Sequence, residues 1–479
     1  MEIDNIINDY SLRELQIISS RILSDHESTN NFIKQFKADH DSHQFYKNVI
    51  KWYIEKYKRF PESENKIGPT KDNTFCFYPF YALAMKQFEN NKLKRVAPCC
   101  KMHNNEKSML TKEEIGSLTP LEIFEHKKFE KLRNDSLNNI RNENCSICWD
   151  QENRGLLSYR MKSSWIFDDD FKKDLREFDV SFSNKCNLIC RMCNLGGSHQ
   201  FYKDLNFFKK NDMLSEVEKS TSGTTFPTIN IDTENNVQLN WLLKNYECIK
   251  FLKVSGGEPL YDKKVVKLIN LLVENDYAKD VMLQFHTNAT LLDDKNIELL
   301  NNFKLQMHVF SVDGTNKIYN YIRHNSSFDL IENNIVNWLS KSNNIKSVAF
   351  NLVLSALNVL DLKNYFEWIS NTFSYKHNIK IHISEIRPFT RGTSLYNVPV
   401  NVLKLAKERV MQFTQNNQNN LLRYEIENIS KLIDLGIHKN TFDKNASMLK
   451  SEITSFDKSR NQSYKDFLDP VLIDVLEKI

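Results

Sequence analysis

Cys186, Cys190 and Cys193 lie within eight residues of one another, with the spacing C-x3-C-x2-C. Three thiolates on one tight loop can hold three corners of a cubane iron–sulfur cluster and leave its fourth corner open to another ligand. A structural zinc site needs a fourth protein ligand, and His199 is the one nearby candidate. The spacing therefore favours an open iron–sulfur cluster over structural zinc.

A second group of cysteines precedes this loop in the chain. Its members are Cys76, Cys99, Cys100, Cys145 and Cys148. The last two form a C-x2-C pair, a two-ligand clip that serves both iron–sulfur clusters and zinc. The ninth cysteine, Cys248, stands apart, and we expect it to be a buried apolar side chain.

The compartment follows from the same residues and from the N-terminus. The chain begins with polar and acidic residues, and it contains no run of about 18 apolar residues. We therefore expect no signal peptide, no transmembrane helix and a cytoplasmic protein. Clustered cysteines in a reducing compartment bind metal or do redox chemistry more often than they form disulfides.

An alternation of strands and helices must position these cysteines. From about residue 175, β-rich runs alternate with helical patterns. The expected strands are Phe178–Phe182, Ile249–Val254, Val281–His286, Leu305–Val312, Val348–Leu354 and Ile379–Ile386, and the expected helices include Lys264–Glu274, Asp294–Asn301, Leu330–Leu339 and Leu362–Thr372. This order implies a parallel sheet with right-handed crossovers, in either an open doubly wound sheet or an incomplete (β/α) barrel. In both folds, chemistry collects at the carboxyl ends of the strands, and the three-cysteine loop follows the first strand.

The regions around this core give four expected parts. Residues 1–70 read as a polar helical region, and residues 71–170 as a cysteine-rich region with one amphipathic helix, Pro120–Leu137. The β/α core covers 171–395. Residues 396–479 form a helical segment that ends in an amphipathic stretch, Phe467–Ile479.

A glycine-rich segment follows the second expected strand: Gly256, Gly257, Glu258 and Pro259. The glycines allow the backbone to approach a ligand closely, and Glu258 offers a carboxylate to an ammonium group. Placed one strand after the three-cysteine loop, this segment resembles the GGEP element of the radical S-adenosylmethionine (SAM) superfamily. The resemblance implies a partial (β/α)6 TIM-like barrel. It also implies a [4Fe–4S] cluster on the three cysteines, with SAM on its open iron and the SAM amino group at Glu258.

The resemblance implies further SAM contacts at the ends of later strands. Asn288 and Thr290 match a family segment near the ribose and methionyl part of SAM, with Ala289 in place of a glycine. Ser311 and Arg323 are expected either at the ribose hydroxyls and carboxylate of SAM or in structural hydrogen bonds. Met192 is expected to line the adenine through its backbone.

The upstream cysteines resemble those of twitch proteins, radical SAM enzymes that carry a shortened SPASM domain. This resemblance implies an auxiliary [4Fe–4S] cluster on Cys76, Cys99, Cys145 and Cys148, with Cys100 as the alternative to Cys99. A tetrathiolate zinc site is the alternative for the whole group.

The overall charge limits the class of partner. Lys and Arg total 65 against 61 Asp and Glu, a formal net charge of +4, which speaks against a protein that wraps nucleic acid. Hydrophobic residues make up 41% of the chain, enough for a large core.

The resemblance implies an enzyme that takes one electron from a flavodoxin- or ferredoxin-type partner. Cleavage of SAM would yield methionine and a 5′-deoxyadenosyl radical that abstracts hydrogen from a substrate. The substrate class stays open between a peptide or protein and a small molecule. Glu385 and Arg387 on the last expected strand are candidates to bind a polar substrate or to pair with each other. The alternative function is a non-catalytic iron–sulfur or zinc-binding scaffold or interaction protein on the same fold.

Overall fold

The computed structural model describes most of the chain from residue 73 onward. The described residues are 47, 51, 69, 73–89, 92–102, 110–153, 158–163, 173–194, 196–213, 237–342, 344–373, 379–385, 391–416 and 422–479. The helical prediction for 1–70 lies outside them, apart from Lys47 and Lys51, which are helical.

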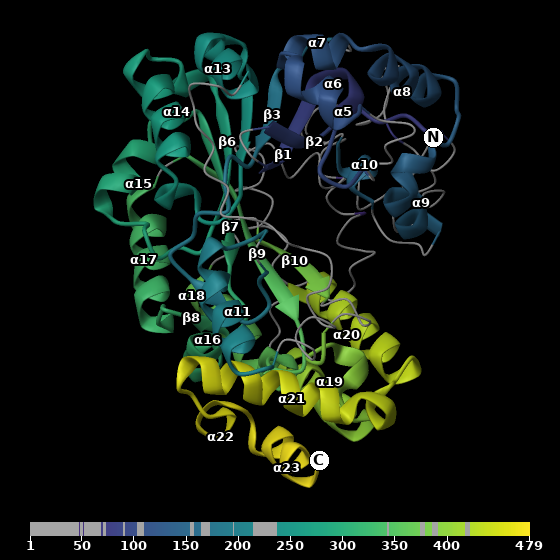
Figure 1. The fold of residues 1–479 in the computed structure, drawn as a ribbon, viewed down its shortest axis with the longest axis vertical. Helices are drawn as coiled ribbons and strands as arrows, with labels where there is room; N and C mark the ends of the chain where they lie inside the picture. The colour runs from purple at the N-terminus through teal and green to yellow at the C-terminus, as the bar shows by residue number, and fades with distance from the viewer. Residues whose placement is uncertain are drawn as a thin grey trace. The chain divides into compact units, whose positions relative to one another are not determined.

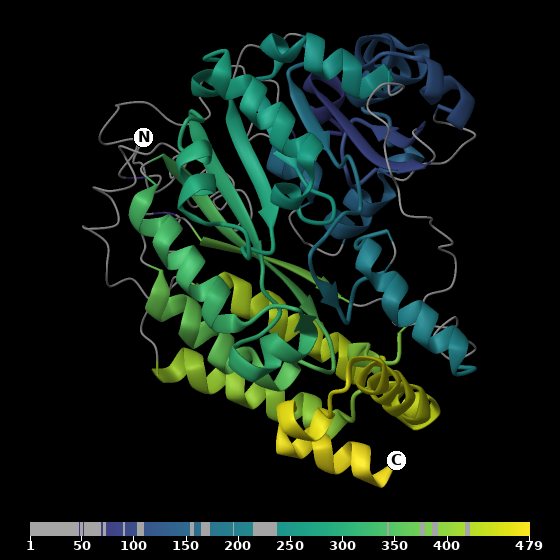
Figure 2. The same ribbon diagram turned by 60° about the vertical axis from the view of Figure 1, so that its left-hand side comes forward.

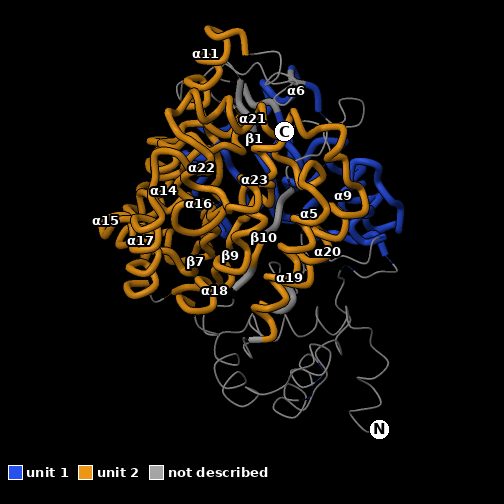
Figure 3. Tube along the Cα trace, turned by 90° about the horizontal axis from the view of Figure 1, so that it is seen from below, with its two compact units in different colours: residues 1–181, 231–253 blue, residues 182–230, 254–479 orange. Residues whose placement is uncertain are grey.

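The chain divides into two compact units (Figure 3). The N-terminal unit comprises Met1–Ser181 and Ile231–Lys253, and the C-terminal unit comprises Phe182–Asn230 and Val254–Ile479. The four-part division drawn from the sequence stays a prediction.

Parallel strands and helices alternate in the C-terminal unit, as predicted. In sheet order the strands are β10 (Ile379–Glu385), β9 (Ile345–Leu354), β7 (Leu305–Ser311) and β6 (Met282–Thr287), and each neighbouring pair is parallel. The helices between them are α14 (Lys263–Glu274), α15 (Asp294–Leu300), α16 (Asn316–Ile322), α17 (Phe328–Lys341) and α18 (Leu362–Thr372). Figures 1 and 2 show α14, α15 and α17 side by side along one face of these strands.

The apolar periodicity of the helices explains this packing. Along α14, residues at helical spacing are buried: Val265, Leu268, Ile269 and Leu272. Along β6, buried and half-buried side chains alternate, so one face of the strand is covered and the other is more open. Aromatic side chains fill the covered side, where Phe310 lies 5.3 Å from Trp338 and Phe350 lies 5.4 Å from Trp368, measured between ring centroids.

The C-terminal segment is helical, as predicted. Its helices, yellow-green to yellow in Figure 1, are α19 (Val400–Asn416), α20 (Arg423–His438), α21 (Phe442–Arg460), α22 (Tyr464–Phe467) and α23 (Pro470–Lys478). The predicted amphipathic stretch from Phe467 is divided between the end of α22 and α23, because Asp469 caps a new helix that begins at Pro470. Helix α11 (Tyr202–Lys210) packs on α21 through Phe208 and Phe456.

The N-terminal unit has its own strands. In sheet order they are β5 (Phe251–Val254, whose last residue belongs to the other unit), β3 (Glu177–Val180), β1 (Ala82–Glu89) and β2 (Lys92–Ala97). Strand β1 runs parallel to β3 and antiparallel to β2. The hairpin of β1 and β2 is absent from the sequence-based expectations.

Short helices complete this unit. They are α5 (Tyr78–Tyr81), α6 (Lys112–Ser117), α7 (Pro120–Glu125), α8 (Lys127–Leu137), α9 (Ser146–Asn153), α10 (Tyr159–Lys162) and α13 (Val237–Lys244). The single helix predicted over 120–137 is therefore two helices. His126 separates them with an extended backbone, and its Nδ1 accepts a hydrogen bond from the amide of Lys128 at 3.2 Å. None of the helices in the described residues has both the length and the apolar character that crossing a membrane requires.

Candidate active site

The three-cysteine loop opens the C-terminal unit. Cys186 and Cys190 are buried and Cys193 is half-buried, with Leu188 as their apolar centre. The two-residue strand β4 (Ile189–Cys190) pairs with β8 (Arg323–His324), which fixes the backbone of Cys190. Burial raises the pKa of all three thiols, that of Cys190 to about 12.

The glycine-rich segment after β5 is locked to this loop. The amide of Gly257 donates to the carbonyl of Ser183 at 3.2 Å, and the amide of Glu258 donates to that of Lys185 at 2.8 Å. A Cβ on Gly257 would lie 2.1 Å from the Lys185 carbonyl oxygen, so only glycine fits here. The two predicted elements therefore meet through their backbones.

Glu258 is fully buried and joins this segment to the end of β6. One carboxylate oxygen accepts from the Thr287 hydroxyl at 2.8 Å, and the other from the Asn288 amide at 2.7 Å. Burial raises the pKa of Glu258 to about 7, and these hydrogen bonds act against that rise. Pro259 follows as the first residue of a short 3-10 helix, Pro259–Tyr261.

Asn288 and Thr290 also contact the cysteine loop. The Asn288 side-chain amide lies 3.9 Å from the Cys186 sulfur and donates to the Asn187 side chain at 3.0 Å. The Thr290 hydroxyl donates to the Asn288 side chain at 2.6 Å and accepts from that of Asn187 at 2.7 Å. Ala289 is buried with φ of +63°, so it adopts a left-handed conformation that its methyl group strains.

Arg323 reaches the second cysteine. Its Nη1 lies 3.7 Å from the Cys190 sulfur, and its Nε donates to Asp313 at 2.7 Å. Asp313 in turn accepts from the amide of Val353 at 2.7 Å. Arg323 therefore has the structural partners that its alternative role implied, and Ser311 is half-buried at the end of β7.

The sequence suggested no role for Asp313, and for His199 only that of a zinc ligand. The Asp313 carboxylate orients the Arg323 side chain. Its position at a strand end, two residues after Ser311, is a sequence feature that could have marked it as a candidate site residue. His199, considered above as a zinc ligand, accepts a hydrogen bond at Nδ1 from the backbone amide of Cys186 at 3.1 Å. Gly256 and Met192 lie in the same unit, exposed and half-buried respectively.

The residues present fit a thiolate-bound cluster. Several donors point toward the sulfurs: the Leu188 amide is 3.4 Å from Cys186, and Asn288 and Arg323 approach Cys186 and Cys190. Hydrogen bonds and positive charge at a sulfur favour its deprotonated, metal-binding form.

The upstream cysteines surround one cavity in the N-terminal unit. Those that line it are Cys76, Cys99, Cys145 and Cys148. Burial is the main cause that raises the pKa of each thiol, and repulsion among them adds to it for Cys76, Cys99 and Cys145. Arg160 also lines the cavity, and Glu152 holds its guanidinium at 2.7 Å. Four thiols around one cavity, with the Arg160–Glu152 ion pair at its wall, fit an iron–sulfur cluster, which is larger than a single metal ion.

Cys100 is not among the residues that line this cavity. After burial, the nearby Asp179 carboxylate is the main cause that raises its pKa, and Lys253 opposes that rise. Cys248 is half-buried, and its thiol donates to the Asn245 carbonyl at 2.9 Å. Strand β10 ends at Glu385, whose side chain lies outside the described residues, as does Arg387. Within the described part of the chain, no three His, Cys, Asp or Glu side chains are grouped so as to hold a single metal ion.

Residues 180–369 match the family model of the radical SAM superfamily. This segment is a radical SAM domain. It contains every residue predicted to contact SAM, from Cys186 to Arg323, whereas the upstream cysteines precede it.

Two curated relatives resemble this chain. Over 201 residues it is 26% identical to the probable GTP 3′,8-cyclase of Methanocaldococcus jannaschii, covering 42% of this chain and 57% of the relative. Over 237 residues it is 24% identical to the GTP 3′,8-cyclase of Clostridium perfringens, covering 48% and 61%. The chain thus spans about three-fifths of the length of these relatives.

Solved structures to which this chain is similar include Streptococcus suis SuiB bound to S-adenosylmethionine and anSMEcpe with bound AdoMet. The TM-scores are 0.31 and 0.34, at 12% and 16% sequence identity. The likeness covers 61% of this chain and 51% of SuiB, and 50% of this chain and 62% of anSMEcpe.

Proposed function

We propose that the chain is a radical SAM enzyme that cleaves SAM reductively and abstracts hydrogen from a C–H bond of its substrate. The observation that carries this proposal is the interlock of the cysteine loop with the Gly256–Pro259 segment, held by the amides of Gly257 and Glu258. When bound, a [4Fe–4S] cluster supplies the electron that breaks the carbon–sulfur bond of SAM.

In this proposal each group of residues at the site has its own role. Cys186, Cys190 and Cys193 hold the cluster, and Asn288 and Arg323 donate toward its thiolates. Glu258, in its ionised form, accepts a hydrogen bond from the amino group of SAM. The backbone near Gly256 and Met192 and the side chains of Thr290 and Ser311 lie at the remaining positions predicted to contact SAM.

We also propose that Cys76, Cys99, Cys145 and Cys148 hold an auxiliary [4Fe–4S] cluster of the twitch type. Their shared cavity and the Arg160 guanidinium support this assignment. A flavodoxin- or ferredoxin-type protein of the cytoplasm is the proposed reductant.

The test is anaerobic reconstitution with iron and sulfide, followed by dithionite and SAM. We expect the electron paramagnetic resonance (EPR) spectrum of the reduced protein to change when SAM is added, and 5′-deoxyadenosine to appear by chromatography. The matched control is the chain with Cys186→Ala, Cys190→Ala and Cys193→Ala, which should lose both signals. If the wild-type chain carries its full complement of iron but its EPR spectrum does not change when SAM is added, the result would support the scaffold function instead.

A further inference from the structure

Three buried ion pairs join helix α21 to the rest of the C-terminal unit. They are Arg191 with Asp457 at 2.6 Å, Arg391 with Glu452 at 2.8 Å, and Arg460 with Asp204 at 2.7 Å. The side chains of all six residues are less than one-tenth exposed. In two of these pairs the arginine either belongs to the cysteine loop, as Arg191 does, or donates to its backbone, as Arg391 does.

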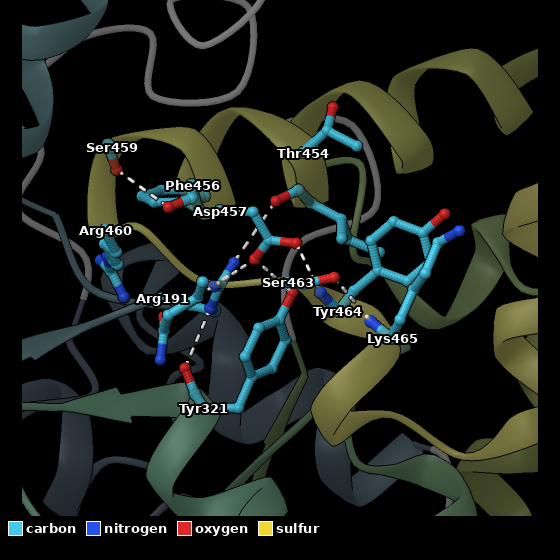
Figure 4. A network of polar contacts seen from close by, with 12 residues as sticks. Arg191, Tyr321, Thr454, Phe456, Asp457, Ser459, Arg460, Ser463, Tyr464 and Lys465 are labelled. Atoms are coloured by element: carbon cyan, nitrogen blue, oxygen red, sulfur yellow. Dashed lines mark hydrogen bonds and ion pairs between the residues drawn. The ribbon is translucent and has the colours of Figure 1, made fainter.

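Arg191 lies inside that loop, between Cys190 and Cys193, but its side chain points to α21 (Figure 4). Its Nη2 donates to Asp457 at 2.6 Å and to Gln462 at 3.0 Å, and its Nε donates to the Tyr321 carbonyl at 2.9 Å. The guanidinium also stacks on the Tyr321 ring at 3.6 Å from its centroid.

Asp457 is itself held on several sides. It accepts from the Tyr321 hydroxyl at 2.8 Å and from the backbone amide of Tyr464 at 2.7 Å (Figure 4). These two hydrogen bonds orient the Asp457 carboxylate independently of its contact with Arg191. This network makes the position of Arg191 depend on α21.

Arg391 holds the other end of the same loop segment. Glu452 on α21 fixes its Nε, which leaves Nη1 to donate to the Cys193 carbonyl at 3.3 Å and Nη2 to donate to the Arg191 carbonyl. The next residue, Gly392, touches α21 directly, since a Cβ there would lie 2.3 Å from the Met448 carbonyl oxygen. The Arg391 guanidinium thus connects α21 to the backbone carbonyls of Arg191 and Cys193, which lie on either side of Met192.

The third pair offers a comparison. Arg460 and Ser459 hold Asp204, which lies on α11. Neither residue has a described hydrogen bond to the cysteine loop, and Arg460 acts on Cys190 and Arg191 only through its charge. Buried ion pairs commonly stabilise a fold no more than apolar side chains of similar volume, so fold stability alone is a weak reason for three of them on one helix. Directional contacts to a loop need the geometry that guanidinium groups supply.

We propose that α21 is a buttress of the cluster loop. Asp457 and Glu452 act through Arg191 and Arg391 as positioning residues that hold Cys190 and Cys193 apart in the arrangement that accepts the cluster. This inference rests on the proposed function and extends it to a helix outside the radical SAM domain.

The experiment compares three reconstituted full-length variants with the wild type: Asp457→Asn, Glu452→Gln and Asp204→Asn. Each removes one partner of a buried pair on α21, so all three should lose thermal stability in the iron-free form. We expect only Asp457→Asn and Glu452→Gln to lose the SAM-responsive EPR signal, by about tenfold relative to Asp204→Asn. An equal loss in all three variants would overturn the proposal.

A milder variant keeps the test decisive if Asp457→Asn does not fold. Tyr321→Phe removes the phenol that orients Asp457 and leaves Arg191 its carboxylate. We expect a smaller loss of the same signal, together with faster release of iron to a chelator than from Asp204→Asn. Unchanged release would count against the buttress. A wild-type chain without any SAM-responsive signal would refute the proposed function instead, so the two failures are distinguishable.

Discussion

Glu258 carries the clearest prediction at the scale of one residue. Burial raises its pKa to about 7 in the folded protein, against 4.5 as the ordinary value. The protonated carboxyl therefore stabilises the cofactor-free fold below about pH 4.5, and that contribution is lost as the pH rises through about 7. In the proposed function the amino group of SAM binds the ionised form of Glu258, so SAM affinity should rise as the pH increases.

Between pH 6 and pH 8 we expect the affinity of the loaded wild-type protein for SAM to rise about tenfold. Glu258→Gln, which keeps the shape and can keep its contacts to Thr287 and Asn288, should bind SAM more weakly at every pH and show no such rise. Equilibrium dialysis with labelled SAM measures both. Iron content should stay the same in the two proteins, and parallel pH profiles would contradict the role of Glu258.

Cys99 and Cys100 give a second prediction at this scale. Cys99 lines the cavity with the other upstream cysteines, whereas Cys100 is near Asp179 and Lys253. Cys99→Ser should therefore remove the iron of the proposed auxiliary cluster, about four atoms per chain, and Cys100→Ser should leave it in place. Iron analysis after reconstitution decides between them, and the opposite result would exchange the two assignments.

At the scale of elements, two glycines that face different surroundings form a matched pair. Gly257→Ala would force its Cβ against the Lys185 carbonyl and separate the Gly256–Pro259 segment from the cysteine loop. Gly436 lies inside α20, where a Cβ would meet its nearest atom at 3.4 Å, an ordinary contact.

We expect Gly257→Ala to lower the melting temperature of the iron-free protein and to reduce SAM-responsive cluster loading at least severalfold. Gly436→Ala should be neutral or stabilising, by up to about 1 kcal/mol, because alanine favours the helix. Thermal melts and EPR measure both variants. Normal loading of Gly257→Ala would mean that the backbone contact is dispensable.

The same scale shows what the sequence could predict. Between Phe251 and Thr372, the strands β5, β6, β7 and β9 and the helices α14, α15, α17 and α18 were predicted within a few residues, because apolar periodicity and strand composition agree there. Helix α16 and the two-residue strand β8 were not among the predicted elements. Strand β1 was missed because Ala82–Glu89 consists largely of residues that favour helices, and its pairing with β2 and β3 makes it a strand. The break at His126 depends on a side-chain cap that composition does not reveal.

The site residues also divide into those that a local sequence pattern marks and those that it does not. Cysteine spacing and the Gly-Gly-Glu segment are local patterns, so they could be proposed as site residues from the sequence. Arg191, Arg391, Glu452 and Asp457 carry no local pattern, because each finds its partner far along the chain; Arg191 and Asp457 are 266 positions apart.

At the scale of the molecule, each compact unit contains its own set of cysteines. Two independent clusters should then give about eight irons per chain, and Cys186→Ala, Cys190→Ala and Cys193→Ala together should leave about four. Burial keeps the thiols protonated in the iron-free form, so loading releases protons and should proceed further at pH 8.5 than at pH 7. Iron and sulfide analysis checks both expectations, and loss of all iron from the triple variant would contradict separate sites.

The contact between Arg191 and Asp457 also sets an order of events during protein synthesis. At about 5–20 residues per second, the ribosome completes Asp457 roughly 13–53 s after Arg191. Throughout that interval the cysteine loop exists without the carboxylates of α21. An iron–sulfur carrier that met the growing chain in this interval would find Arg191 without its carboxylate partner, so insertion of the cluster should follow synthesis of α21.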